Sequence, residues 1–458
     1  MDQPAAAPKK PTYEELEAKV KTLEETAERL LKRIDELERA GKRQASPFSK
    51  GDPKRRPRPP GRKPGDDYGE HSARALPTTF DETHDVPAPE RCPDCGGSVL
   101  AEEVVEQFQT DLPEPRPITR RFRLHVGRCT GCRRRIQPRH ALQTSDAIGA
   151  AASQLGPRAT ALAVATNKVY GPSWAKTASL LARGFGLKVA PSTLCRAALR
   201  LGEKLAPTYD AIRETVAASP IVYPDETGWR CGGHRRWLWA FVAKTATLYR
   251  IAASRGGEVA EWALGARFAG ALGRDGWAAY RRFLLALHQS CLGHLIRRAC
   301  EILLVAKRGA ARFASGVKRV LQGAIELRDE RDSGALDASA FARAREALEA
   351  ELDWLLSWTP TYSANARFRK HLRAERPHLF TFLDVPGLEA TNWPAEQAIR
   401  PAVIARKLSG CNRTDRGARA QERLMSVART AVQRERGVIE TFERAIVATR
   451  PIDVFAPA

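Results

Sequence analysis

Three acidic residues, each in a distinctive local setting, are the residues of this sequence that could do chemistry together. Asp225 ends the apolar run of IVYPDETGW, Asp275 ends the run of AGALGRDGW, and Glu396 lies in TNWPAEQAIRP. Apolar runs that stop at an acid predict strand ends, where acids from neighbouring strands can converge. Asn392 and Pro394 suit a helix start, which places Glu396 near the positive end of the helix dipole.

Carboxylates that converge repel one another and raise one another's pKa unless a cation neutralises them. Two divalent ions held about 4 Å apart can do so, and such a pair binds a scissile phosphate, activates a water or a 3′-hydroxyl and stabilises the leaving oxygen. We therefore expect Asp225, Asp275 and Glu396 to hold Mg²⁺ or Mn²⁺ for phosphoryl transfer. Arg400, one helical turn after Glu396, would be available for a phosphate. Any of these acids taken alone could equally be a solvated surface residue.

The two aspartates need a sheet to bring them together, and the hydrophobic pattern predicts one. The segments IVYPDETGW, WLWAFVAK, TLYRIAA, AGALGRDGW and LLALHQSC predict a hairpin-rich set of strands followed by a strand–helix–strand unit. The expected fold is multidomain α/β, with a mixed-sheet catalytic core of ribonuclease H type. The core would consist of residues 215–294 and 386–436, with a helical insertion over 295–385 and a C-terminal tail over 437–458.

Four cysteines have the spacing of a zinc site. Cys92 and Cys95 lie in CPDC, and Cys129 and Cys132 lie in CTGC. Two such knuckles can supply four thiolates to a tetrahedral Zn²⁺, as in a zinc ribbon, here expected over 91–142. The segment between the knuckles is long, and alternating apolar and polar residues near its end predict a β-hairpin that returns the second knuckle to the first. Unrelated reduced thiols are the alternative.

The net charge indicates a polyanionic partner. The chain has 458 residues, with 75 Lys and Arg against 53 Asp and Glu, a formal charge of +22 and a pI near 10.0. Nucleic acid is the simplest such partner, and a membrane surface is the weaker interpretation. No apolar window reaches about 20 residues and the N-terminus lacks the apolar core of a signal peptide, so we expect a cytosolic protein. In the cytosol, nine cysteines favour metal ligands or buried thiols over disulfides.

Several segments could contact DNA. Residues 41–90 form a basic, Pro-rich linker that could lie in a minor groove or simply be solvated. Residues 150–210 predict three short helices, the second after Ser173 and the last with Ser192 as N-cap; this arrangement resembles a helix-turn-helix, although a plain helical spacer would look the same. The candidate contacts are Arg55, Arg56, Arg62 and Lys63 in the linker, Arg133 and Arg134 after the second knuckle, Arg196 and Arg200 on the last helix, and Arg400.

The N-terminal segment carries a heptad repeat. Apolar residues recur at alternating steps of three and four from Tyr13 to Leu37, with charged residues between them. This pattern predicts a coiled coil over 11–40 that pairs two or more chains. An amphipathic helix packed on its own protein is the alternative.

Taken together, these motifs resemble the insertion sequence 66 family, a branch of the Asp-Asp-Glu transposases. The likeness extends over nearly the whole chain, and YPDETGW, RDGWAAY and NWPAEQAIRPAVIARKLSGCNRTDRGARAQE are its most specific parts. The resemblance implies that Asp225, Asp275 and Glu396 are the catalytic metal ligands. It also matches Cys291 and His294 to a Cys-x-x-His element of several transposase groups, although a packed cysteine and a helix-start histidine would look the same.

The resemblance implies a function and its partners. The expected activity is binding of the terminal inverted repeats of an element, nicking to free 3′-hydroxyls, and attack of these hydroxyls on target DNA. Accessory proteins of the same element could take part, and the expected location is the nucleoid of a bacterial cytoplasm. A ribonuclease-H-like nuclease without strand transfer, or a non-catalytic zinc-ribbon regulator, is the alternative.

Overall fold

The computed structural model describes residues 76–100, 103–149 and 153–456, together with the isolated residues 17, 20, 22 and 26. By its internal contacts the chain divides into two units, Phe48–Pro117 and the remainder, Met1–Pro47 with Ile118–Ala458. The four isolated residues are helical. The rest of the predicted coiled coil and most of the basic linker, including Arg55, Arg56, Arg62 and Lys63, lie outside the described residues.

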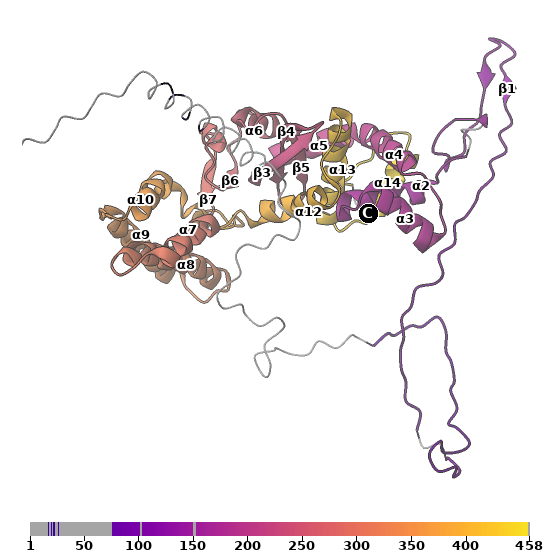
Figure 1. Ribbon diagram of the computed structural model, residues 1–458, viewed down its shortest axis with the longest axis horizontal. Coiled ribbons are helices and arrows are strands. Elements are labelled where there is room, and N and C mark those ends of the chain that lie inside the picture. The colour runs from indigo at the N-terminus through magenta and orange to yellow at the C-terminus, as the bar shows by residue number, and fades with distance from the viewer. Residues whose placement is uncertain are drawn as a thin grey trace, which may run out of the picture. The chain divides into compact units, whose positions relative to one another are not determined.

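A five-stranded mixed sheet forms the centre of the larger unit (Figure 1). Its strands are β3 (Ile221–Cys231), β4 (His234–Val242), β5 (Thr247–Ala252), β6 (Ala271–Arg274) and β7 (Leu287–Ser290). They lie in the order β5-β4-β3-β6-β7, with β3, β4 and β5 antiparallel and β3, β6 and β7 parallel. The predicted mixed sheet is confirmed, and its hairpins followed by parallel strands are consistent with a ribonuclease-H-like core.

The edge strand β5 is closed by side chains of α13 (Asp415–Gln433). The backbone N–H groups of alternate β5 residues donate to three acceptors spaced one helical turn apart on α13. The pairs are Ile251 to Glu422 Oε2 (2.8 Å), Tyr249 to Ser426 Oγ (2.8 Å) and Thr247 to Thr430 Oγ1 (3.1 Å). Because an open edge strand exposes unpaired N–H groups, this arrangement both protects the sheet and fixes the helix on it.

A group of helices directly precedes the sheet. They are α2 (Pro157–Ala165), which continues as the π-helical segment η3 (Thr166–Tyr170), then α3 (Trp174–Phe185), α4 (Pro191–Lys204) and α5 (Ala206–Ala217). The prediction that Ser192 caps α4 is wrong: Ala190 is the N-cap, because Pro191 takes the first helical position. Ser173 does cap α3, accepting a hydrogen bond from the backbone N–H of Lys176 (3.3 Å).

Helix α4 packs closely on α13. A Cβ added to Gly202 of α4 would lie 2.8 Å from both Cα and Cβ of Ala420, so only glycine allows the two helices to approach this far. The opposite face of α4, which carries Arg196 and Arg200, is exposed. The helices predicted to resemble a helix-turn-helix are thus anchored, through α4, on the helix α13 that closes the sheet.

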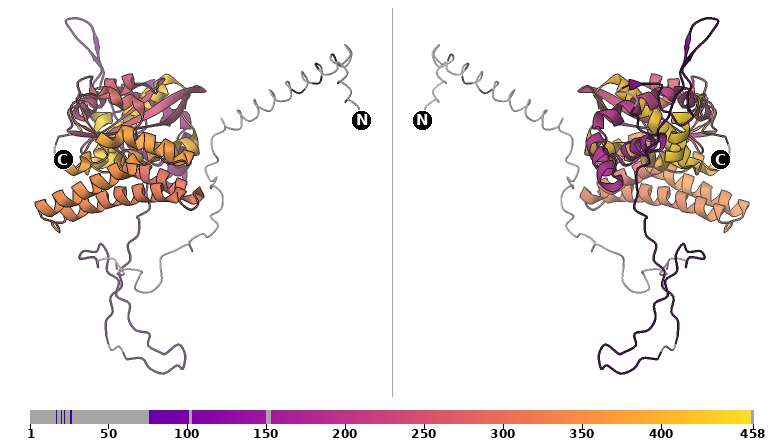
Figure 2. Two further views of the ribbon diagram at one scale, coloured as in Figure 1. Left: turned by 90° about the vertical axis from the view of Figure 1, so that its left-hand side faces the viewer. Right: turned by 90° about the vertical axis from the view of Figure 1, so that its right-hand side faces the viewer.

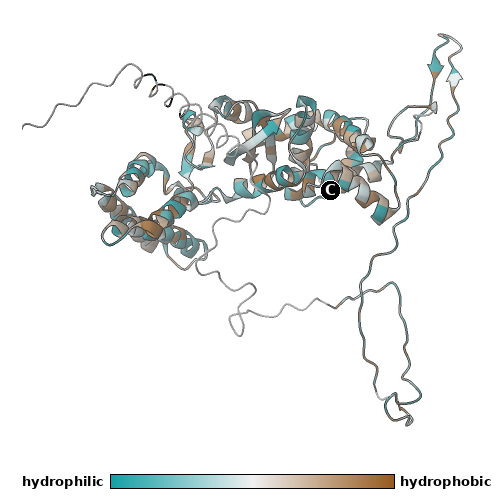
Figure 3. Ribbon diagram, in the orientation of Figure 1, coloured by the Kyte–Doolittle hydropathy of each residue, from teal (hydrophilic) through white to brown (hydrophobic). Residues whose placement is uncertain are grey.

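A helical segment follows the last strand, β7, and corresponds to the predicted insertion. It lies at one side of the sheet in Figures 1 and 2. Its elements are α7 (Leu292–Val305), α8 (Ala310–Asp332), α9 (Ala338–Ser357), α10 (Ser363–Glu375), η5 (Arg376–His378) and α11 (Thr381–Asp384). Apolar and polar residues share these helices, coloured brown and teal in Figure 3.

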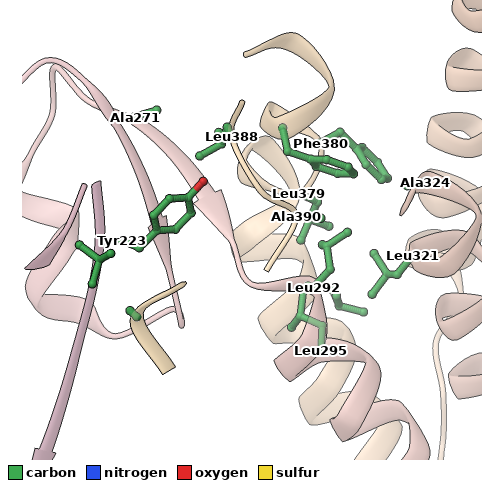
Figure 4. Close-up of a cluster of buried hydrophobic side chains, with 14 of the residues drawn as sticks. Tyr223, Ala271, Leu292, Leu295, Leu321, Ala324, Leu379, Phe380, Leu388 and Ala390 are labelled. Atoms are coloured by element: carbon green, nitrogen blue, oxygen red, sulfur yellow. The ribbon is translucent and has the colours of Figure 1, made fainter. Parts of the chain in front are cut away.

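The insertion helices and the sheet share one apolar core. Tyr223 of β3 packs in the same cluster as Leu292 and Leu295 of α7 and Leu321 of α8, together with Leu388 (Figure 4). Burying a leucine side chain contributes on the order of 2 kcal/mol. The insertion is therefore fixed against the strand that carries the first acid.

The remaining elements complete the larger unit. They are α6 (Gly257–Leu264) and η4 (Ala278–Arg282) among the strands, and α12 (Trp393–Ser409) and α14 (Val438–Val447) after the insertion. The segment 437–458, expected as a tail, contains α14, whose Phe442 is fully buried. None of the helices in the described part of the chain is long and apolar enough to cross a membrane.

The two cysteine knuckles form short hairpins. Arg91 bridges Ser98 around the first knuckle, in the smaller unit. Around the second knuckle, in the larger unit, β1 (Gly127–Arg128) pairs with β2 (Arg135–Ile136). The β-hairpin predicted from the alternation before Gly127 is wrong, because residues 121–126 form no strand. A two-stranded hairpin is only marginally stable by itself, which is consistent with the short length of these strands.

Candidate active site

The strand register brings the two aspartates level with each other. In the parallel pair, Ile221 lies opposite Ala271 and Val222 opposite Leu272, and the same register carried forward places Asp225 opposite Asp275. Asp275 directly follows the end of β6. The expectation that Asp225 ends its strand is wrong, because the residue lies within β3. After its pairing with β6 has stopped, β3 continues as a hairpin with β4.

Tyr223 holds the segment before α12 against β3. Its ring occupies the space over Gly273, where a Cβ would lie 2.5 Å from the ring. Its hydroxyl accepts a hydrogen bond from the backbone N–H of Glu389 (2.8 Å) and donates to the carbonyl of Gly387 (3.4 Å). The chain leading to the third acid is thus fixed two residues away from Asp225 along β3.

Asn392 joins three separate segments immediately before α12. Its backbone N–H donates to Sγ of Cys291 (3.2 Å), at the start of α7. Its side-chain amide donates to the carbonyl of Pro224 (2.9 Å), the residue before Asp225. Asn392 is the N-cap of α12, as predicted, but its side chain makes no capping bond because it reaches across to β3 instead.

Glu396 occupies the first turn of α12, as the sequence indicates. The helix then runs along the sheet: the hydroxyl of Tyr249 in β5 donates to the carbonyl of Ala398 (2.6 Å), and Arg406 donates to the carbonyl of Gly228 in β3. Pro401 does not interrupt the helix. Docked at its start and along its length, α12 holds Glu396 on the same side of the sheet as Asp225.

Asp225 is affected by its burial and by the acids around it. Asp225 has a pKa raised to about 7, first by burial and then by the negative charges of Glu226, Asp275 and Glu396. The backbone N–H of Glu226 donates to Asp225 (2.8 Å), and that of Trp277 donates to Asp275 (2.9 Å). Among the described residues, neither aspartate forms an ion pair. The two aspartates are thus bound by backbone N–H donors and not by cationic side chains.

Glu226 points to the other face of β3 and has a different role. Successive side chains of a strand point to opposite faces of the sheet, so the side chain of Glu226 points to the face opposite that of Asp225. Its carboxylate, almost fully buried, is bound by Arg255 (2.8 and 2.9 Å) and by the hydroxyl of Tyr280 (2.7 Å). The Arg255 guanidinium stacks on the ring of Trp277 (3.9 Å to the centroid). Sequence analysis missed this set, although Glu226, Trp277 and Tyr280 lie in the YPDETGW and RDGWAAY motifs that signalled the acids; Arg255 lies outside both motifs.

A buried ion pair connects the strand of the second acid to the insertion. Arg274, the residue before Asp275, contacts Glu375 of α10 (2.8 Å), and both side chains are 1% exposed. Ser290 and Arg281 also donate to Glu375. Burial alone would raise the pKa of Glu375, but the Ser290 hydrogen bond and the Arg274 charge bring it below its ordinary value. Sequence analysis did not single out either member of this pair.

The Cys-x-x-His element meets the third acid. Side-chain donor atoms of Cys291, His294 and Glu396 lie within 4.8 Å of one another, an arrangement that could hold a metal ion. His294 Nε2 is 3.7 Å from Glu396 Oε1. A hydrogen bond with Cys291 is the main cause that raises the pKa of His294, which favours its charged form beside the carboxylate. Cys291 therefore contacts the start of α12, and His294 lies beside the acid in its first turn.

By type the three acids suit a hard divalent cation, whereas the donor atoms found within 4.8 Å of one another among the described residues are those of Cys291, His294 and Glu396. Asp225, Asp275 and Glu396 offer carboxylate oxygens, the ligands preferred by Mg²⁺ and Mn²⁺. The buried Oδ1 of Asn392, whose amide nitrogen binds the carbonyl of Pro224, has no hydrogen-bond partner among the described residues. A bound cation would offset the burial and the like charges that raise the pKa of Asp225.

Each cysteine knuckle, taken by itself, has the same backbone geometry. Cys92 N–H donates to the carbonyl of Gly97 (2.8 Å) and Cys129 N–H to that of Arg134 (2.9 Å). In each knuckle, the backbone N–H of the second cysteine is the main cause that lowers the pKa of the first, as a metal-binding thiolate requires. All four cysteines are free thiols. Their joint binding of one Zn²⁺ stays a prediction.

The other predicted DNA contacts lie on the surface. Those in the described part of the chain, which form no ion pair there, are Arg133, Arg134, Arg196, Arg200 and Arg400. Exposed, unpaired arginines are available to phosphates, although nothing in the geometry distinguishes them from ordinary solvated side chains.

Comparison with known proteins agrees with this architecture. A search of curated proteins found no match. The model of the family described as "Transposase IS66 family" matches residues 152–420, more than half of the 458 residues and a range that includes all three acids of the site. The chain therefore belongs to the IS66 family of transposases.

Proposed function

We propose that this transposase nicks DNA at the ends of its element and joins the freed 3′-hydroxyls to target DNA, with Asp225, Asp275 and Glu396 as its metal-binding acids. The observation that carries the proposal is the docking of the start of α12 on β3, where the Asn392 amide binds the carbonyl of Pro224 (2.9 Å), so that one region holds the segments of all three acids. The acids come from β3, the end of β6 and the first turn of α12, segments far apart in the sequence.

The protein's own residues would prepare the site in two ways. Trp277 and Glu226 direct backbone N–H groups at the two aspartates and so fix the carboxylate orientation before substrate arrives. Asn392 and Tyr223 hold the start of α12, so that Glu396 approaches from one direction. When bound, a divalent metal pair would supply Lewis acidity for water activation and leaving-group stabilisation.

Cys291 and His294 would act as positioning residues for Glu396. The Sγ of Cys291 accepts the N–H at the N-cap of α12, and the His294 imidazole lies beside the Glu396 carboxylate. Loss of Cys291 would let the helix start shift, whereas loss of His294 would leave the carboxylate free to rotate.

Cleavage of a duplex that carries the inverted repeats flanking the gene tests the proposed function. The wild-type chain should nick this duplex only with Mg²⁺ or Mn²⁺, and Asp225→Asn and Asp275→Asn should each reduce the rate by orders of magnitude. A pre-cleaved end with a 3′-hydroxyl tests strand transfer separately. Nicking without joining would favour a nuclease, and end binding without nicking in the wild type would favour a non-catalytic regulator.

A further inference from the structure

Two arginines and one glutamate line a hollow in the insertion. The hollow, of about 220 Å³, lies between α7 and α10 and is lined by Arg298, Glu301, Ile302, Val305, Ala364 and Arg367. Among the described residues neither Arg298 nor Arg367 forms an ion pair. Some arginines of the insertion are paired with acids, for example Arg376 with Asp353 (2.7 Å), while others, such as the exposed Arg343, form no ion pair among the described residues.

The two guanidinium groups are close enough to repel each other. The pKa of Arg298 is lowered first by burial and then by the positive charge of Arg367, while the charge of Glu301 acts more weakly in the opposite direction. The guanidinium of Arg298 is held over the ring of Phe368, 5.2 Å from its centroid. Two like charges kept side by side by packing are stabilised by an anion that binds both.

The hollow is close to the second catalytic acid. His371, one helical turn after Arg367 on α10, has a pKa lowered by burial and by the charges of Arg298 and Arg281, among others. A Cβ added to Gly276 would lie 3.6 Å from Cε1 of the same histidine. Since Gly276 directly follows Asp275, His371 lies beside the loop of that acid and within range of the Arg298 charge.

The size and chemistry of the hollow select a phosphate group. Small-molecule sites usually occupy about 300–1,000 Å³, so this hollow suits a single functional group of a larger ligand. Guanidinium groups match the geometry of phosphate oxygens and remain charged at any physiological pH. We propose that Arg298 and Arg367 bind a backbone phosphate of the DNA strand whose scissile phosphate lies at the three acids. This inference rests on the proposed function, because it takes DNA as the substrate.

A matched set of full-length variants tests the contact by binding alone. Arg298→Gln with Arg367→Gln removes both charges, and Arg343→Gln, an exposed arginine of α9 in the same insertion, is the control. Binding of a fluorescent duplex without divalent metal is measured over a range of salt concentrations. The double variant should bind about three- to tenfold more weakly at low salt, with a log–log salt slope smaller by about 0.9 for each phosphate that the protein no longer neutralises. The control should keep the wild-type slope.

The exposed side chain of Arg367 provides a variant that leaves the core intact. Arg367→Gln alone should lose part of the affinity with an unchanged melting temperature, whatever the double variant does to folding. An affinity and a slope equal to those of the wild type in Arg367→Gln and in a folded double variant overturn the proposal.

Neutral phosphates locate the contact on the DNA. A series of duplexes, each with one methylphosphonate near the cleavage site, is titrated with the wild type and with Arg367→Gln. One position should weaken wild-type binding several-fold and the variant clearly less, because one of the two charged partners is already gone. An equal penalty in both proteins at every position refutes the contact. Cleavage by the wild type and its loss in Asp225→Asn are scored on the unmodified duplex, so the proposed function can stand while this inference fails.

Discussion

Replacing Asp225 with asparagine should stabilise the metal-free protein while it abolishes activity. The asparagine keeps the size of the side chain and an oxygen that can accept the Glu226 N–H, but it removes a negative charge from a buried site. That charge is unfavourable because Asp225 is buried and faces the charges of Asp275 and Glu396. Neutralising a carboxylate that serves metal binding at a cost in stability makes the metal-free protein more stable. Neutralising a structural carboxylate that has a cationic partner makes the protein less stable.

The raised pKa of Asp225 gives the expected magnitude and its pH dependence. A shift from the ordinary value of 3.8 to about 7 disfavours the charged form by on the order of 4 kcal/mol, at 1.36 kcal/mol per pKa unit. Between these two values the folded protein holds a proton that the unfolded chain has released, so stability falls as pH rises through this range. The gain from Asp225→Asn should therefore be largest above pH 7 and should vanish near pH 4.

Thermal unfolding of the metal-free protein at several pH values, with and without Mg²⁺, measures this effect. At pH 8 the variant should melt several degrees above the wild type, and Mg²⁺ should raise the melting temperature of the wild type much more than that of the variant. Glu389→Gln, which changes an exposed acid paired with Arg328, is the control and should show neither effect. If Asp225→Asn is less stable than the wild type at pH 8, or gains equally from Mg²⁺, the reasoning is refuted.

Four further outcomes follow. Glu396→Gln should lower nicking and strand transfer by orders of magnitude and leave DNA affinity and its salt slope unchanged, whereas Glu389→Gln should stay active; the reverse pattern in cleavage assays would show that the third acid is misplaced. Glu375→Gln breaks a buried ion pair and should destabilise the protein by about 3–5 kcal/mol. Because the pKa of Glu375 is lowered, this loss should shrink as pH falls toward and below that pKa, and equal losses at pH 7 and pH 3 would contradict it. Cys92→Ser should release zinc detectable by metal analysis while the catalytic core keeps its melting transition, and a wild type without zinc would argue against the site. Deletion of residues 1–40 should reduce the mass seen by sedimentation, unless the heptad helix packs on its own chain.

The sequence by itself determined the features that depend on neighbouring residues. The apolar runs before Asp225 and Asp275 specified the strands β3 and β6, and Asn392 and Pro394 specified the start of the helix that carries Glu396. Strand and helix formation follow local periodicity and capping, so these elements could be predicted without knowledge of the fold. The same local rule failed at Ser192, where a proline one residue earlier began the helix.

Only the tertiary structure decided what the residues next to these acids do. The sequence does not reveal that Glu226 faces away from Asp225 to bind Arg255, or that Asn392 reaches β3 in place of capping its own helix. Nor does it reveal that Arg274 is buried against Glu375 of the insertion. Each of these contacts joins segments at least 29 positions apart in the chain, the separation between Glu226 and Arg255. Which partner such a side chain meets depends on how helices and strands pack together, because a buried polar group bonds to whatever donor or acceptor the finished fold brings within reach.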